Sequence, residues 1–156
     1  MLLFGCAAGA VGGTWVLSRI PAGAAPGTYP VQLTPAQWRA RLSPAAFAVL
    51  REDQTEAPGA SPLLNEHRRG RFTCAGCDQA LYSSTTKFDS GTGWPSFYAP
   101  LPRAIATRQD VSMIIPRTEV HCSHCGGHLG HVFDDGPKPT GLRYCMNGVA
   151  MKFQPA

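Results

Sequence analysis

Four of the six cysteines form two CxxC pairs, Cys74 with Cys77 and Cys122 with Cys125. Each pair places two thiolates on one tight bend of the backbone, so two pairs can supply the four soft ligands of a tetrahedral zinc ion. A long segment separates the pairs, and we therefore expect one structural zinc per chain that clamps two hairpins and leaves no position for a catalytic water. Two disulfide bonds or a redox-active CxxC are the alternatives. His121 and His124 flank the second pair and are expected to be surface loop residues rather than ligands.

Cys145 is a candidate nucleophile on a predicted strand that spans Leu142–Asn147. Successive side chains of a strand point to opposite faces, so a reactive face and an apolar face are expected here. The reactive face carries Arg143, Cys145 and Asn147, and the apolar face carries Leu142, Tyr144 and Met146. A positive charge at Arg143 would favour the thiolate of Cys145, which is the reactive form. An inert buried cysteine is the alternative interpretation.

Two histidines three residues apart, His128 and His131, precede this strand. A histidine close to a thiol can deliver a proton, and Asp134 or Asp135 could orient its ring. A hydrogen-bonded histidine in the core is an equally good interpretation of either position. The sequence GWPSF at residues 93–97 forms a rigid aromatic corner, which considered alone is expected to pack in the core.

Short elements must position these residues. Thr34-Pro35, with Gln37 three residues after the threonine, predicts a helix that begins at Pro35. Ser43-Pro44 repeats this pattern and predicts a second helix over Pro44–Arg51. From Gly70 onward, short runs of β-branched and aromatic residues alternate with Gly, Pro, Asn and Asp, which is typical of strands and turns. The two clearest predicted strands are Val111–Ile115 and the strand that carries Cys145.

The composition indicates one globular domain with a tail. The chain has 156 residues, of which 44% are hydrophobic and 15% charged. The formal net charge is +4, but the basic residues are scattered, apart from the cluster Arg68, Arg69 and Arg71, and no aromatic platform lies beside that cluster. The sequence therefore does not predict nucleic-acid binding.

Residues 1–32 are interpreted as an apolar leader or anchor with a linker rich in Pro, Gly and Ala, and residues 33–156 as the catalytic domain. Ala22–Ala24 could be a cleavage site, although no Lys or Arg precedes the apolar stretch as in a secretory signal. The stretch is also shorter than the roughly 20 residues that span a bilayer. We expect export, to the periplasm or with membrane attachment through this segment, and cytoplasmic location is the alternative.

Five segments together resemble the B-type methionine sulfoxide reductases in order and spacing: LTPAQWRARLS, RFTCAGCDQALYSS, KFDSGTGWPSF, HCSHCGGHLGHVFDDGP and LRYCMNGVAMKF. The resemblance covers about Leu33 to Gln154. It implies a mainly β fold of two packed antiparallel sheets, called a β-tent, with short N-terminal helices and a zinc site made by the four paired cysteines.

The resemblance also implies a chemistry. The cysteine that matches Cys145 attacks the sulfoxide sulfur, and the histidine that matches His131 helps to protonate the departing oxygen. Reduced methionine leaves, and a sulfenic acid remains. Arg143, Asn147 and Asp135 match further catalytic positions, while Trp94, His128 and Phe97 are expected to bind the substrate. The family acts on the R epimer at sulfur.

Two departures from the family pattern matter. Many members carry a resolving cysteine two residues before the tryptophan, where this chain has Thr92, so the usual internal disulfide cannot form. The segment Pro58–Leu64 also lacks the aromatic residue usual there. The expected partners are oxidised proteins or peptides and thioredoxin or a small thiol as reductant, and the chain is expected to be a monomer. A noncatalytic zinc scaffold that binds proteins is the alternative function.

Overall fold

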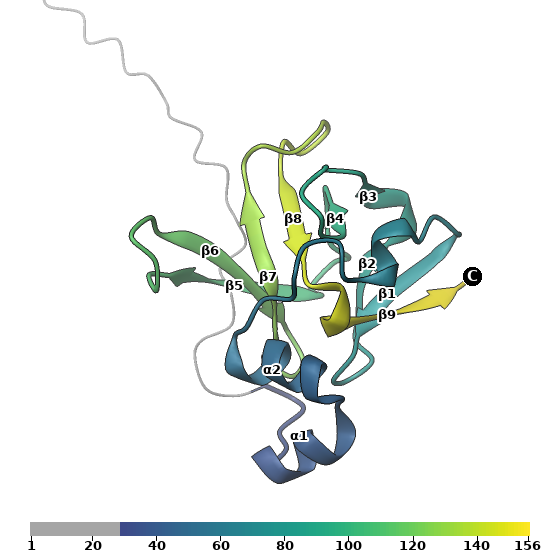
Figure 1. The fold of residues 1–156 in the computed structure, drawn as a ribbon. Helices are drawn as coiled ribbons and strands as arrows, with labels where there is room; N and C mark the ends of the chain where they lie inside the picture. Colours follow the sequence, from purple (N-terminus) through teal and green to yellow (C-terminus); the bar gives the residue numbers. More distant parts are fainter. Residues whose placement is uncertain (1–28) are drawn as a thin grey trace, which may run out of the picture.

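The computed structural model describes residues 29–156 (Figure 1). The predictions for the apolar leader and its cleavage site therefore fall on residues outside the described part of the chain, and Cys6 also lies there. Among the described residues, no helix is long and apolar enough to cross a membrane.

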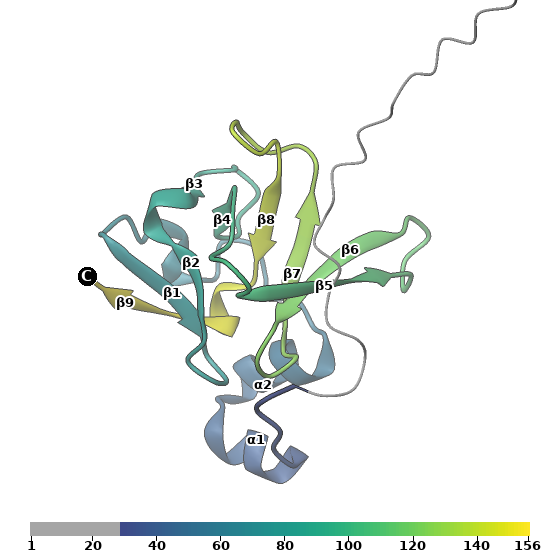
Figure 2. The same ribbon diagram turned by 180° about the vertical axis from the view of Figure 1, so that it is seen from behind.

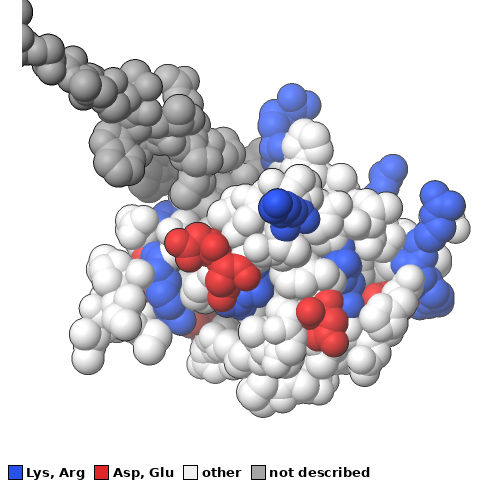
Figure 3. Space-filling view, turned by 90° about the horizontal axis from the view of Figure 1, so that it is seen from above, with Lys and Arg blue, Asp and Glu red and all other residues white. Residues whose placement is uncertain are grey.

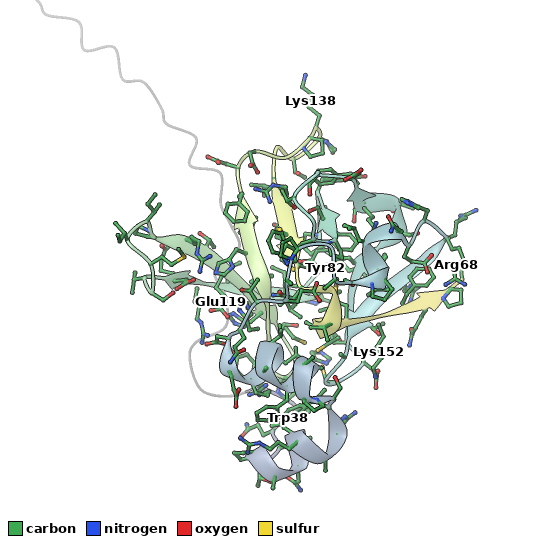
Figure 4. All side chains as sticks on the ribbon, in the orientation of Figure 1. Trp38, Arg68, Tyr82, Glu119, Lys138 and Lys152 are labelled. Atoms are coloured by element: carbon green, nitrogen blue, oxygen red, sulfur yellow. The ribbon has the colours of Figure 1, made fainter. Side chains whose placement is uncertain are left out.

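Two short helices open the described chain, α1 (Pro35–Arg41) and α2 (Pro44–Glu52), where the sequence predicts them. The side chain of Thr34 accepts a bond from the backbone N–H of Gln37, and the side chain of Gln37 accepts one from the N–H of Thr34, which is a complete capping box. Trp38 is buried at the junction of the two helices (Figure 4).

The rest of the chain is mainly strands with three short 3₁₀ turns, η1 (Pro62–Asn65), η2 (Ser84–Thr86) and η3 (Gly148–Ala150). The strands are β1 (Gly70–Cys74), β2 (Ala80–Ser83), β3 (Lys87–Phe88), β4 (Ser96–Phe97), β5 (Ile105–Asp110), β6 (Arg117–Cys122), β7 (His128–Phe133), β8 (Arg143–Met146) and β9 (Met151–Pro155). They form a three-stranded sheet in the order β2-β1-β9 and a six-stranded sheet in the order β3-β4-β8-β7-β6-β5, and all pairs are antiparallel. The expected mainly β fold with two antiparallel sheets and short N-terminal helices is confirmed.

The core lies between the sheets. Tyr82 of the small sheet stacks on Phe97 of the large sheet with ring centroids 4.3 Å apart, and Phe72 meets Phe97 edge-on at 4.9 Å. The hydroxyl of Tyr82 donates to the sulfur of Met146 over 3.2 Å, so its polar atom is satisfied in the interior (Figure 4). Burial raises the pKa of Tyr82 well above its ordinary value. The helices close one end of the molecule, below both sheets in the views of Figures 1 and 2.

The prediction of a strand at Val111–Ile115 is wrong. These residues form the loop between β5 and β6, whose hairpin projects from the body of the molecule (Figure 2). Val111, Met113, Ile114 and Ile115 are the exposed large hydrophobic residues of the described chain, and Ile114 is fully exposed. The β-branched run resembles a strand in isolation, but its large side chains stay mostly exposed in the described structure.

Candidate active site and metal centre

The two CxxC pairs meet in one cluster. Cys74 and Cys77 lie at the turn between β1 and β2, and Cys122 and Cys125 at the turn between β6 and β7, so the cluster joins the two sheets. The four Sγ atoms lie within 4.8 Å of one another, with 3.7 Å between Cys74 and Cys125 and 3.5 Å between Cys77 and Cys122. A tetrahedron with metal–sulfur bonds of about 2.3 Å has edges of about 3.8 Å. The donor set therefore fits one metal ion held by four thiolates.

The other cysteine of the described residues, Cys145, stands outside this cluster on the central strand β8. Arg143 and Cys145 are partly exposed, whereas Tyr144 and Met146 are buried, which is the alternation that the sequence predicts. Cys145 pairs with Ser96 on one neighbouring strand and with His131 on the other. Directly opposed residues of antiparallel strands have Cβ atoms about 5 Å apart, so His131 and Cys145 face one another on one side of the sheet.

A small cavity of about 130 Å³ opens above Cys145. Its walls are Thr55, Trp94, Arg117, Gly130, His131, Phe133, Cys145 and Asn147. The structure thus brings together Cys145, His131, Asn147 and Trp94, four of the residues singled out from the sequence. A larger cavity of about 610 Å³ lies between α2, η1 and η3, but neither Cys145 nor His131 lines it.

Gly130 explains how closely β7 approaches β8 at this cavity. A Cβ atom at Gly130 would collide with the carbonyl oxygen of Cys145. Any side chain there would push the two strands apart. The close approach keeps His131 opposite the thiol.

Asp110, at the end of β5, orients His131, and sequence reasoning missed it. Oδ2 of Asp110 lies 2.7 Å from Nε2 of His131 and 2.7 Å from a guanidinium nitrogen of Arg117. A carboxylate only accepts, so Nε2 of His131 carries the proton and Nδ1 is the nitrogen that can take up or release one. Burial lowers the pKa of His131, partly offset by the bond to Asp110. Bonds from Ser112, and next from His131, hold the pKa of Asp110 well below its ordinary range.

His128 lies behind His131, with ring centroids 5.4 Å apart. Its Nδ1 donates to the buried carboxylate of Glu119 over 2.8 Å, and Arg108 pairs with the same carboxylate. Burial opposes ionisation of Glu119, but the bonds from His128 and Arg108 lower its pKa below the ordinary value. Figure 4 labels Glu119 on the large sheet. His128 thus supports the ring of His131 from the interior, and the oxygens of Asp53 and Glu119 that lie close to it are already bonded by Arg108.

Glu56 holds two walls of the cavity and was also missed. Its backbone carbonyl accepts from the indole N–H of Trp94 at 3.1 Å, and its backbone N–H donates to Oδ1 of Asn147 at 3.0 Å. Its carboxylate accepts the backbone N–H groups of Gly148 and Val149. Long-range contacts of this kind leave no periodic signal in the sequence.

Asp135, expected among the catalytic residues, contacts Arg143. Its carboxylate makes two bonds of 2.8 Å with that guanidinium and is 60% exposed. The bond to Asp135 is the main cause that raises the pKa of Arg143, and the nearby Cys145 adds a smaller effect. Arg143 also lies over the ring of Phe133, 4.4 Å from its centroid. This pair fixes the guanidinium on the face of Cys145.

Two expectations from the sequence need correction. Phe97 is fully buried against Phe72 and Tyr82, so it packs in the core and does not line the cavity at Cys145, whereas Phe133 does. His121 is buried on β6 rather than in a surface loop, whereas His124 is exposed as expected. His121 lies on the same face of β6 as Glu119, and Tyr29 packs edge-on against its ring.

The model of the SelR domain family matches residues 42–155. A peptide methionine sulfoxide reductase MsrB of Agrobacterium fabrum is 49% identical over 126 residues, which cover 80% of this chain and 93% of the relative. Proteins of the same name from Bradyrhizobium diazoefficiens and Leptospira interrogans are 53% and 46% identical, over 76% and 81% of this chain and 86% and 97% of the respective relative.

Proposed function

This chain belongs to the SelR domain family, together with the peptide methionine sulfoxide reductases named MsrB, and from that premise we propose that it reduces methionine R-sulfoxide in proteins through the thiol of Cys145. The observation that carries the proposal is the small cavity that joins Cys145, His131, Trp94 and Asn147. An oxidised methionine side chain is slender enough to enter such a cavity from a peptide.

The proposed reaction transfers one oxygen atom. The thiolate of Cys145 attacks the sulfoxide sulfur and forms a sulfur–sulfur bond, while the sulfoxide oxygen takes up a proton. The sulfur–sulfur bond and the sulfur–oxygen bond of the substrate then break, a bond forms between the oxygen and Sγ of Cys145, and the products are a sulfenic acid on Cys145 and reduced methionine. Two equivalents of a thiol then return Cys145 to the thiol, with one disulfide and one water as products. Thioredoxin or a small thiol is the proposed reductant.

His131 is the proposed proton donor to the departing oxygen, and Asp110 is the residue that positions its ring. The 2.7 Å bond at Nε2 holds the proton on that nitrogen and directs the exchange of protons to Nδ1. The partly exposed Arg143, fixed by Asp135, places a positive charge on the face of the thiol, which favours the attacking thiolate.

Trp94 and Asn147 are the proposed walls for the substrate. The ring of Trp94 gives an apolar surface for the methyl group on sulfur, and Phe133 adds a second aromatic surface. The side-chain amide of Asn147 donates to the carbonyl of Leu129 and accepts from Glu56, so its orientation is fixed before substrate binds. Preorganised groups of this kind lower the barrier because they need no rearrangement during the reaction.

Zinc is the proposed metal of the four-cysteine cluster, because four thiolates in a closed tetrahedral set are typical of structural zinc. Bound there, the ion would supply folding energy rather than chemistry. We further propose that the protein is exported on its apolar leader, to the periplasm or with membrane attachment through this segment. Cell fractionation tests this, because the protein would be found in the periplasmic or membrane fraction, and recovery in the cytoplasmic fraction alone would contradict it.

An assay that resolves the two sulfoxide epimers tests the function. With dithiothreitol as reductant, the full-length protein is expected to reduce the R epimer of peptide-bound methionine sulfoxide and to leave the S epimer. Cys145→Ser keeps the shape of the side chain but loses the nucleophile, so it is expected to fold normally and to lose activity. A folded, zinc-loaded wild-type protein without reductase activity would support the noncatalytic scaffold instead.

A further inference from the structure

The hydroxyl of Thr92 contacts the sulfur of Cys145 and begins a chain of hydrogen bonds. Oγ1 of Thr92 lies 3.8 Å from Sγ of Cys145 and 2.8 Å from the hydroxyl of Ser90. Ser90 in turn lies 2.7 Å from the hydroxyl of Ser96, which donates to the backbone carbonyl of Trp94 at 3.1 Å. Three hydroxyls therefore connect the proposed nucleophile to a carbonyl group.

The turn that carries Thr92 is fixed by backbone geometry. Gly91 and Gly93 have φ values of +68° and +92°, which favour glycine, and the carbonyl of Gly93 accepts a bond from the N–H of Gly59. Ser96 is fully buried and pairs directly with Cys145 across β4 and β8. The inner end of the chain is thus shielded from water, where hydrogen bonds are stronger.

The number of available protons fixes the direction of donation along this chain of hydrogen bonds. Each hydroxyl has one proton to donate. Because Ser96 donates to Trp94, Ser90 must donate to Ser96, and Thr92 must donate to Ser90. Thr92 then offers only a lone pair to the sulfur, so Cys145 is the donor, as a thiol or as a sulfenic acid.

A thiolate at Cys145 needs the opposite direction, because it can only accept. Thr92 must turn its proton to the sulfur, Ser90 must donate to Thr92, and Ser96 must donate to Ser90. The carbonyl of Trp94 then loses this bond. The reversal requires only rotation of three hydroxyl groups, with no proton gained or lost by the chain.

We propose that Thr92 is a further catalytic residue, which donates to the Cys145 thiolate before attack and accepts from the sulfenic acid after it, through reversal of the hydroxyl chain. The inference rests on the proposed function, since it assigns a role at the reacting sulfur. Thr92 occupies the position where many relatives in the resemblance carry a resolving cysteine. In this chain the residue at that position stabilises the sulfur by hydrogen bonding instead of forming a disulfide.

Three variants of the full-length protein test the proposal. Thr92→Val removes the hydroxyl at nearly constant volume, Thr92→Ser keeps the hydroxyl, and Ser90→Ala frees the proton of Thr92 for the sulfur. The readouts are the rate of alkylation of the Cys145 peptide by iodoacetamide at fixed pH, followed by mass spectrometry, and the rate constant of a single turnover with methionine R-sulfoxide. Circular dichroism confirms that each variant folds.

Thr92→Val is expected to lower both rates roughly tenfold to hundredfold, as for the loss of one hydrogen bond to a charged acceptor. Thr92→Ser is expected to stay within about twofold of the wild type, and Ser90→Ala to match or exceed the wild-type alkylation rate because the thiolate no longer requires reversal of the chain.

Wild-type rates in Thr92→Val would overturn the proposal, as would a Thr92→Ser protein as slow as Thr92→Val, since the methyl group would then be the important part. A Ser90→Ala protein slowed like Thr92→Val would also overturn it, and this variant decides the matter if Thr92→Val does not fold. If the wild type does not reduce methionine sulfoxide, the proposed function fails, while the alkylation rates still report on the hydrogen bond.

Discussion

The charge of His131 depends on the residues around it on three other strands and on its own. Burial favours the neutral ring of His131, whereas Asp110 on β5 favours the charged ring. The charges of Arg117 on β6 and His128 on β7 disfavour the charged ring. Cys145 on β8 faces His131 across the sheet. The pKa of His131 is lowered in consequence. The fraction of imidazolium that can deliver a proton therefore falls as the pH rises through this lowered pKa.

Asp110→Asn is expected to narrow the pH range of activity. The substitution removes a negative charge that raises the pKa of His131, so the pKa of His131 falls further. As the pH is raised, the variant should therefore begin to lose activity at a lower pH than the wild type. At pH 7.5 the kcat of the variant is expected to be roughly tenfold to hundredfold below that of the wild type. This loss is smaller than the full rate factor that proton delivery can contribute. The check is the pH dependence of kcat.

Asp134→Asn is the matched control, since it removes the same charge from an exposed position. Its pH profile is expected to follow the wild type. Superimposable profiles of the wild type and Asp110→Asn would make the bond to His131 structural only.

Thr92→Cys is expected to create the disulfide that this chain lacks. The contact of 3.8 Å between the hydroxyl of Thr92 and the sulfur of Cys145 places the two side chains within reach of a disulfide. After one equivalent of methionine sulfoxide has reacted, the variant should contain a disulfide between the introduced cysteine and Cys145, detected by peptide mapping. The unmodified protein should instead hold a sulfenic acid that a sulfenate-specific reagent traps. A turnover-dependent disulfide of Cys145 in the unmodified protein, with Cys6 examined first, would disprove this.

Among the elements, a bulge on β7 decides how the two histidines are arranged. Residues three apart on a regular strand point to opposite faces. The register passes from Val120 opposite Gly130 to His121 opposite His128, so Leu129 is the extra residue on β7. The bulge turns His128 toward the side of His131, which allows their rings to meet.

The hairpin of β5 and β6 carries Asp110 at the end of one strand and Arg117 at the start of the other. At its apolar tip, Ile114 is fully exposed in the described structure. Ile114→Ser is therefore expected to change the free energy of unfolding by less than about 0.5 kcal/mol. Val120→Ser on β6, which removes a fully buried side chain, is the control and should cost about 2 to 4 kcal/mol. Urea denaturation measures both, and a large loss in Ile114→Ser would mean that the tip packs against the protein.

At the scale of the whole molecule, the cysteine cluster connects the small sheet to the large one, at the end of each hairpin. On the face seen in Figure 3, the charged residues do not form one continuous patch of a single sign, because acidic and basic side chains lie interspersed among uncharged ones. Together with the aromatic packing between the sheets, the cysteine cluster thus connects the two sheets.

Cys125→Ser is expected to lower the free energy of unfolding by more than about 4 kcal/mol and to lose the metal, because metal binding at a structural site contributes directly to folding. Cys145→Ser is the control, since it removes a cysteine outside the cluster and should keep one zinc per chain. Elemental analysis and thermal unfolding provide the measurements. A Cys125→Ser protein with wild-type stability and no metal in either protein would refute the zinc site.

Local chemistry is what the sequence alone determined. Some features depend only on neighbours a few residues away, so the spacing of residue types predicts them. They are the capped starts of both helices, the alternation that separates Arg143 and Cys145 from Tyr144 and Met146, and the two CxxC motifs. The resemblance to the family added the fold and favoured Cys145 as the nucleophile over an inert buried cysteine.

Tertiary structure decided which distant residues meet. Asp110 and Glu56 reach the site across strands and turns far from Cys145 in sequence, and neither has a motif of its own. The residues GWPSF alone indicate core packing for Phe97, as the structure has it, and only the resemblance to the family assigns Phe97 to the substrate site. The strand prediction for Val111–Ile115 rests on local propensity, whereas burial depends on the partner that packs against a residue. Only the packed sheets supply that partner to Phe97 and leave the tip of the hairpin without one.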